Sequence, residues 1–90
     1  MNISFENYKN NKNKGTLIDI RDKFKYNMNH LNSSINIPVN EILYNVNILS
    51  KEKIYFLICD SGKVSFKLSR LLNNLGYKTY SIDGGYMSIH

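Results

Sequence analysis

The fold that we expect for this chain is decided by one segment, Ile54-Tyr55-Phe56-Leu57-Ile58-Cys59-Asp60-Ser61-Gly62-Lys63-Val64-Ser65. Its first six residues are apolar without alternation, which is typical of a strand covered on both faces in the middle of a parallel sheet. A helical pattern follows at once, with apolar residues on one face at Val64, Leu68, Leu71, Leu72 and Leu75. Gly76 then predicts a left-handed stop. The segment therefore predicts a buried strand joined by a short loop to a well-defined helix.

Shorter patterns on either side of this segment predict further strands and helices. Apolar runs indicate strands at 16–20, at 79–82 and, before Pro38, at 35–37. Helical patterns cover 4–13 and 39–49. Strands that alternate with helices at this spacing imply an α/β fold, with a small, mainly parallel sheet and helices on both faces. A chain of 90 residues has room for a single domain, residues 1–90.

The composition limits the classes of partner and compartment. The chain has 12 lysine and arginine residues against 7 acidic ones, and the resulting net charge of +5 favours anionic partners. Because the lysines are scattered from Lys9 to Lys78 without clustering, we expect no nucleic-acid interface. The sequence shows no run of about 18 apolar residues and no signal-like N-terminus. We therefore expect a cytoplasmic protein that does not enter a membrane.

Cys59 is the only cysteine, which excludes a disulfide framework and a cysteine-rich zinc site and fits a reducing compartment. Its thiol lies where the chain turns from strand to helix, at the edge of the sheet where ligands bind in such folds. A tight loop there points backbone N–H groups inward, and together with the helix dipole these stabilise a thiolate. Gly62 permits the turn and Lys63 adds a cation, whereas Asp60 opposes a thiolate unless its carboxylate points to solvent. The alternative is that Cys59 merely ends a buried strand, as unpaired cysteines often do.

Five segments in order along the chain resemble motifs of the rhodanese-like domain family, the sulfurtransferases that carry sulfur as a cysteine persulfide. The central one, Cys59-Asp60-Ser61-Gly62-Lys63-Val64-Ser65, is similar to the family's C-x-S-G-x-R-S. Residues 17–22 resemble L-[IL]-D-V-R-[ED], and Tyr26 with 29–38 resembles Y-x-x-G-H-I-P-G-A-I-N-I-P. Residues 72–77 and 83–87 resemble L-x-x-x-G-Y and [ED]-G-G. The resemblance covers nearly the whole chain, and the family's fold agrees with the one predicted above.

The resemblance implies that Cys59 is the catalytic nucleophile and the persulfide carrier. It also implies that the following loop is an anion cradle that binds the substrate, formed by Asp60, Ser61, Gly62, Lys63, Val64 and Ser65. The implied reaction moves sulfane sulfur from thiosulfate or a persulfide donor to a thiophilic acceptor, in two steps. It requires no metal and no organic cofactor. The implied partners are a small anionic sulfur donor, a thiol or cyanide as acceptor, and a sulfur-relay protein.

Departures from the family motif keep a second class of function open. Val64 stands where the family often has arginine, which leaves Lys63 as the loop cation. The alternative function is therefore a non-catalytic rhodanese-like module for binding or regulation. A cysteine phosphatase or arsenate reductase is disfavoured, because those enzymes need a loop arginine and none lies between Cys59 and Arg70.

Structural roles are favoured over catalytic ones for the remaining polar motifs. Asp19 and Arg21 are expected to hold the loop after the first long strand by charge-assisted hydrogen bonds. His30 is expected to anchor its own loop rather than to donate a proton. Gly84 and Gly85 predict a turn that brings the C-terminal segment past the edge of the active site.

Overall fold

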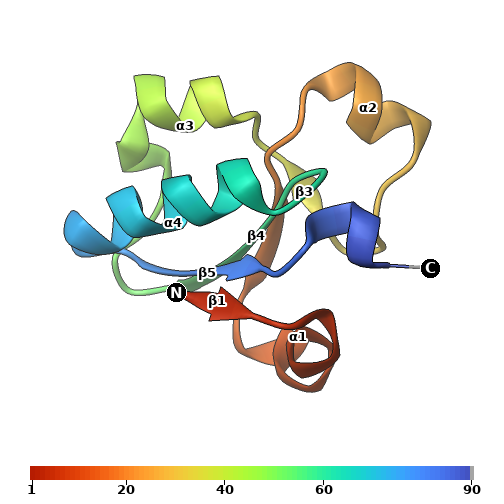
Figure 1. Cartoon of the computed structure of the whole chain (residues 1–90). Coiled ribbons are helices and arrows are strands. Elements are labelled where there is room, and N and C mark those ends of the chain that lie inside the picture. The colour runs from red at the N-terminus through yellow and green to blue at the C-terminus, as the bar shows by residue number, and fades with distance from the viewer. Residues whose placement is uncertain (90) are drawn as a thin grey trace.

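A parallel sheet forms the centre of the molecule. In the computed structural model, which describes residues 1–89, five strands lie in the order β1-β5-β4-β2-β3, and every neighbouring pair is parallel (Figure 1). The strands are β1 Asn2–Ile3, β2 Thr16–Asp19, β3 Ile35–Asn36, β4 Ile54–Ile58 and β5 Lys78–Ile82.

Helices cover both faces of this sheet. Helix α1, Phe5–Asn11, lies on one face, and α3, Val39–Tyr44, and α4, Lys63–Asn74, lie on the other (Figure 1). Helix α2, Lys23–Met28, follows the carboxyl end of β2. Short 3₁₀ turns span η1 Lys12–Lys14, η2 Val46–Ile48 and η3 Gly85–Ser88. The arrangement confirms the predicted α/β fold, with a parallel sheet between helices.

Strand β4 is buried on both of its faces, as its unbroken apolar sequence predicts. Tyr55 and Leu57 belong to the core cluster that α3 and α4 cover. Phe56 and Ile58 alternate with them and belong to the cluster on the side of α1, where Tyr8 lies edge-on against the ring of Phe56. The carboxyl end of β4 is thereby held in a fixed position within the sheet.

Two elements, β1 and α2, are absent from the sequence prediction. Strand β1 is two residues long, which is too short for a period to be visible. Helix α2 buries none of its residues, so it lacks the apolar stripe by which a helix is recognised. One local signal was present, because the Asp22 carboxylate caps α2 by accepting a hydrogen bond from the backbone N–H of Lys25 at 2.9 Å.

Several predicted elements are shorter in the structure. The helix expected at 39–49 ends at Tyr44 because Asn45 leaves the helical region, with φ −145° and ψ 82°. The helix expected at 4–13 ends at Asn11, and Ser4 is its cap, accepting a hydrogen bond from the backbone N–H of Asn7. The strands expected at 16–20, 35–37 and 54–59 each end one residue earlier.

The buried face of α4 differs from the predicted apolar stripe. Leu68 and Leu72 are buried as expected, but the other predicted members, Val64, Leu71 and Leu75, are 48%, 44% and 47% exposed. Fully buried serines take their place against β5. Ser65 lies 2.6 Å from Ser81 and Ser69 lies 2.7 Å from Thr79, oxygen to oxygen, in both cases as a hydroxyl hydrogen bond. Hydrogen bonds to the small hydroxyl side chains of β5 thus allow the serines of α4 to be buried against the sheet.

No helix within residues 1–89 is long and apolar enough to cross a membrane. In the same part of the chain, no three His, Cys, Asp or Glu side chains are grouped so that they could hold a metal ion.

The turn η3 ties the C-terminal segment to the loop after β4. The backbone N–H groups of Tyr86 and Met87 donate to the carbonyl oxygens of Cys59 and Asp60, both at 2.9 Å. The chain can approach so closely because Gly85 has no side chain and adopts a left-handed φ of 54°. A Cβ at this position would overlap the carbonyl oxygen of Cys59. The double glycine therefore forms the turn that the sequence predicts at this edge.

We expect Gly85→Ala to lower the free energy of unfolding by about 3 kcal/mol, because it adds a backbone clash to the strain of a left-handed alanine. Gly76→Ala is the matched control. Gly76 also has a left-handed φ, of 96°, but an added Cβ there meets only the side chain of Lys51 at 3.7 Å. It should cost about 1 kcal/mol. Urea unfolding followed by circular dichroism measures both changes, and equal losses would contradict the role assigned to Gly85.

Candidate active site

The Cys59 sulfur lies between the end of β4 and the first turn of α4. It accepts hydrogen bonds from the backbone N–H groups of Gly62 at 3.1 Å and Ser65 at 3.3 Å. Gly62 caps α4 with a left-handed φ of 88°, which turns the chain so sharply that the helix begins beside the sulfur. The first N–H groups of a helix have no acceptor within it and carry the positive end of its dipole. The arrangement therefore favours negative charge at the sulfur.

A chain of hydroxyl groups continues from the sulfur into the protein. The thiol of Cys59 donates to the Ser65 oxygen at 3.3 Å, and Ser65 is in turn bonded to Ser81 at 2.6 Å. The Ser65 hydroxyl also has the carbonyl oxygen of Gly62 as an acceptor, at 3.2 Å. Because a hydroxyl rotates to suit its partners, Ser65 can donate to the sulfur once the thiol has lost its proton. The thiolate then has a third donor.

The sulfur faces a cavity of about 340 Å³ that opens beyond the carboxyl ends of β2 and β4. Only 5% of Cys59 is exposed, yet the residue lines this cavity. One part of the wall is apolar, with Ile20, Val39 and Val64. The remaining wall is polar, and consists of Arg21, Asp22, Lys25, Asp60 and Ser61. The cavity at the thiol therefore has walls of mixed character.

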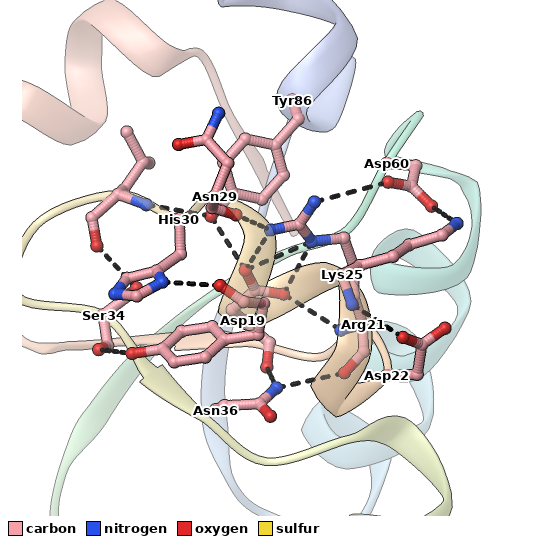
Figure 2. A network of polar contacts seen from close by, with 12 residues as sticks. Asp19, Arg21, Asp22, Lys25, Asn29, His30, Ser34, Asn36, Asp60 and Tyr86 are labelled. Atoms are coloured by element: carbon pink, nitrogen blue, oxygen red, sulfur yellow. Dashed lines mark hydrogen bonds and ion pairs between the residues drawn. The ribbon is translucent and has the colours of Figure 1, made fainter.

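The Asp60 side chain binds cations at the wall of the cavity. Its carboxylate accepts a hydrogen bond from Lys25 Nζ at 2.6 Å and lies 3.7 Å from Arg21 Nη1 (Figure 2). The hydrogen bond to Asp60 and the charge of Asp60 raise the pKa of Lys25. The sequence left open where the Asp60 carboxylate points. In the structure it is paired with these cations and forms no hydrogen bond with the sulfur. Lys25 itself was not predicted, since it belongs to the unpredicted helix α2.

Arg21 is held in place by the buried carboxylate of Asp19 (Figure 2). Its Nε and Nη2 atoms donate to Asp19 at 3.1 and 2.8 Å, and Nη2 also donates to the carbonyl oxygen of Asn29 at 2.6 Å. Burial alone would lower the pKa of Arg21, but the hydrogen bond and charge of Asp19 outweigh it and raise that pKa. The pair thus holds the following loop by charge-assisted hydrogen bonds, as expected.

Tyr86, which sequence reasoning missed, completes this network. Its ring lies 3.9 Å from the Arg21 guanidinium carbon, and its hydroxyl donates to Asp19 at 2.8 Å and accepts from the backbone N–H of Leu31 at 3.1 Å. Burial raises the pKa of Tyr86 to about 12, and the neighbouring Asp19 acts in the same direction. The phenol therefore stays protonated and keeps its role as donor. Its position directly after the double glycine was the available signal.

His30 belongs to the loop below this network and does not line the cavity. Its Nδ1 atom lies 2.6 Å from the carbonyl oxygen of Tyr26, and its ring stacks on the Tyr26 ring with a centroid distance of 3.7 Å. The Tyr26 hydroxyl in turn donates to the carbonyl oxygen of Ser34 at 2.6 Å. His30 thus anchors its own loop, as expected.

The predicted loop residues divide into three groups in the structure. Gly62 and Ser65 bond the sulfur, while Asp60, Ser61 and Val64 line the cavity beside it. Lys63, predicted as the loop cation near the thiol, is not among the residues that line this cavity. It instead lines a neighbouring hollow with Phe66 and Gly84, which shares Ser61 with the cavity. The cations at the cavity are Arg21 and Lys25, from the loop after β2 and from α2.

Comparison with known proteins places this geometry in a family. Residues 4–90 match the rhodanese-like domain. A tRNA sulfurtransferase of Pyrobaculum aerophilum is 33% identical over 66 residues, which are 73% of this chain and 14% of that protein. YtwF of Bacillus subtilis is 31% identical over 72 residues, which are 80% of this chain and 70% of YtwF.

A solved structure agrees with these sequence matches. The rhodanese-related protein of Thermoplasma volcanium superposes with a TM-score of 0.89 at 30% identity, and the match covers 97% of this chain and 87% of that one. The fold, the family match and the place of the cysteine at the end of β4 are all in agreement, and the chain belongs to the rhodanese-like domain family.

Proposed function

We propose that this protein is a sulfurtransferase that carries sulfane sulfur on Cys59 as a persulfide. The observation that carries the proposal is the sulfur at the wall of an open cavity, with the backbone N–H groups of Gly62 and Ser65 donating to it. The relationship to a protein named as a tRNA sulfurtransferase supports the class of reaction. We further propose that residues 1–90 act as one domain.

In the first step the Cys59 thiolate attacks the outer sulfur of the donor. A new S–S bond forms on Cys59 while the S–S bond of the donor breaks, and the electron pair of that bond leaves with sulfite or, for a persulfide donor, with a thiolate. The outer sulfur of the product carries the negative charge. The first-turn N–H groups of α4 are the donors available to stabilise it, because no residue within the helix accepts from them.

In the second step an acceptor thiol or cyanide attacks the outer sulfur of the Cys59 persulfide. The S–S bond breaks, the sulfur leaves on the acceptor, and the Cys59 thiolate is restored against the donors from Gly62 and Ser65. The atoms and electrons of both steps balance without a metal or an organic cofactor. Because the first product leaves before the acceptor reacts, ping-pong kinetics are expected. A sulfur-relay protein is a candidate partner for either step.

Incubation of the protein with thiosulfate or a persulfide donor, followed by intact mass measurement, tests the proposal. We expect a gain of one sulfur atom that a reductant removes, and no gain in Cys59→Ala or Cys59→Ser. Because Cys59 is the only cysteine, the gain maps to one atom. Unchanged turnover in Cys59→Ala would refute the mechanism. Repeated absence of the gain with several donors would instead favour the non-catalytic module.

The Ser65 hydroxyl provides a second test, at the level of thiolate reactivity. Ser65→Ala removes a donor to the thiolate and should slow alkylation of Cys59 by iodoacetamide at pH 7 about fivefold, the value of one modest hydrogen bond. Ser69→Ala is the control, because Ser69 is equally buried one turn further along α4 and is bonded to Thr79 instead of the sulfur. Its alkylation rate should stay at the wild-type value. Equal slowing in both variants would show that general loosening of α4 is responsible.

A further inference from the structure

We propose that Asp60 is a specificity-determining residue, which directs the Cys59 site away from small oxyanionic sulfur donors such as thiosulfate and toward organic persulfides. The inference rests on the proposed sulfur transfer and names the donor class of the same site. It rests on the ion pair between Asp60 and Lys25, the charge balance of the cavity and the apolar groove that continues from it.

The formal charges of the side chains that line the cavity sum to zero. Arg21 and Lys25 contribute two positive charges, and Asp22 and Asp60 contribute two negative ones. Arg21 is also bonded to the buried Asp19 carboxylate, which lies behind the cavity wall. The cavity of a basic protein is therefore without excess positive charge, although the chain as a whole carries +5.

The lysine that is best placed to bind an anion is already occupied. Lys25 Nζ lies 2.6 Å from Asp60 Oδ2, and both side chains are about half exposed at the opening. The remaining positions of the loop do not replace it, because Val64 is apolar and Lys63 lines the neighbouring hollow. An oxyanion that approaches Cys59 must displace the Asp60 carboxylate from Lys25 or accept its repulsion.

This repulsion distinguishes the two donor classes. Thiosulfate brings two negative charges into the cavity and releases sulfite, also a dianion, past the same carboxylate. An organic persulfide brings its reacting sulfur on a carbon carrier and releases a single thiolate, so it carries less negative charge at the opening. In this reaction the Cys59 thiolate bonds the outer sulfur, the donor S–S bond breaks, and the proton of the outer sulfur can pass to the leaving thiolate.

The structure also provides a surface for the organic carrier. A groove of about 220 Å³ between α3 and α4 is lined by Val39, Leu43, Val64, Lys67, Leu68 and Leu71. It shares Val39 and Val64 with the Cys59 cavity, so the apolar wall is continuous from one to the other. Leu43 and Leu71 are 54% and 44% exposed there, which leaves apolar surface for a carrier of matching character. Inorganic thiosulfate makes no use of this surface.

The test compares two donors, thiosulfate and the persulfide of 2-mercaptoethanol, whose carrier is uncharged. Asp60→Asn keeps the shape of the side chain and removes its charge. We expect it to raise kcat/KM for thiosulfate about fivefold to tenfold, through a lower KM, as expected for one surface charge interaction. The value for the organic persulfide should change less than twofold. Asp83→Asn, the same change of net charge at an exposed residue outside the cavity, should change both values less than twofold.

A double variant identifies the cation that Asp60 occupies. In Asp60→Asn combined with Lys25→Gln, the gain with thiosulfate should be lost, because no free lysine remains to bind the oxyanion. The role of Asp60 would be overturned by an unchanged KM in Asp60→Asn, by an equal gain in Asp83→Asn, or by a gain that persists without Lys25. If the wild-type protein takes up sulfur from neither donor, the proposed sulfur transfer itself fails. If it takes up sulfur but Asp60→Asn leaves thiosulfate use unchanged, only the role of Asp60 fails.

Discussion

The burial of β4 on both faces is the constraint on which the site depends. Because side chains from α1 pack on one face and those from α4 on the other, the end of this strand cannot shift within the sheet. Cys59 directly follows it, and the left-handed Gly62 starts α4 three residues later. The electrostatic environment of the thiol thus follows from the packing of a strand whose residues contribute no chemistry of their own.

A layer of hydroxyl groups between α4 and β5 links this packing to the sulfur. Ser65, Ser69, Thr79 and Ser81 are all fully buried, and each is bonded to another member of the layer. Leucines at these positions would bury more apolar surface, but their side chains would offer no hydroxyl group to Cys59. A buried polar layer is tolerated here because its members satisfy one another. The layer gives up some buried apolar surface, and this loss is offset by the hydrogen bond between the Ser65 hydroxyl and the Cys59 thiol.

The parts of this fold that sequence reasoning predicted are those encoded locally. Each of these features has a signal that is contained within a short stretch of sequence. They are the apolar run of β4, the helical period of α4 and the glycines at 62 and 76. The predicted buried face of α4, which included Val64, was wrong in part. Hydropathy alone does not distinguish a serine that is buried from one that is exposed. Lys63 was predicted beside the thiol on sequence distance alone, but as the first residue of α4 it lines a neighbouring hollow together with Phe66. Lys25 lies 34 residues before Cys59 in the sequence, and Tyr86 lies 27 residues after it. Only the folded chain brings both into the network around Arg21 and Asp60.

The hydrogen bonds from η3 to the loop after Cys59 have a consequence for the order of events during synthesis. Tyr86 and Met87 supply the donors to the carbonyl oxygens of Cys59 and Asp60, and Tyr86 also completes the contacts of Asp19 and Arg21. A nascent chain on the ribosome lacks these partners until η3 has emerged, although β4 and α4 precede η3 in the chain and are by then already made. The carbonyl oxygens of Cys59 and Asp60 and the Asp19–Arg21 pair therefore gain these partners later than the sulfur gains the N–H donors of Gly62 and Ser65.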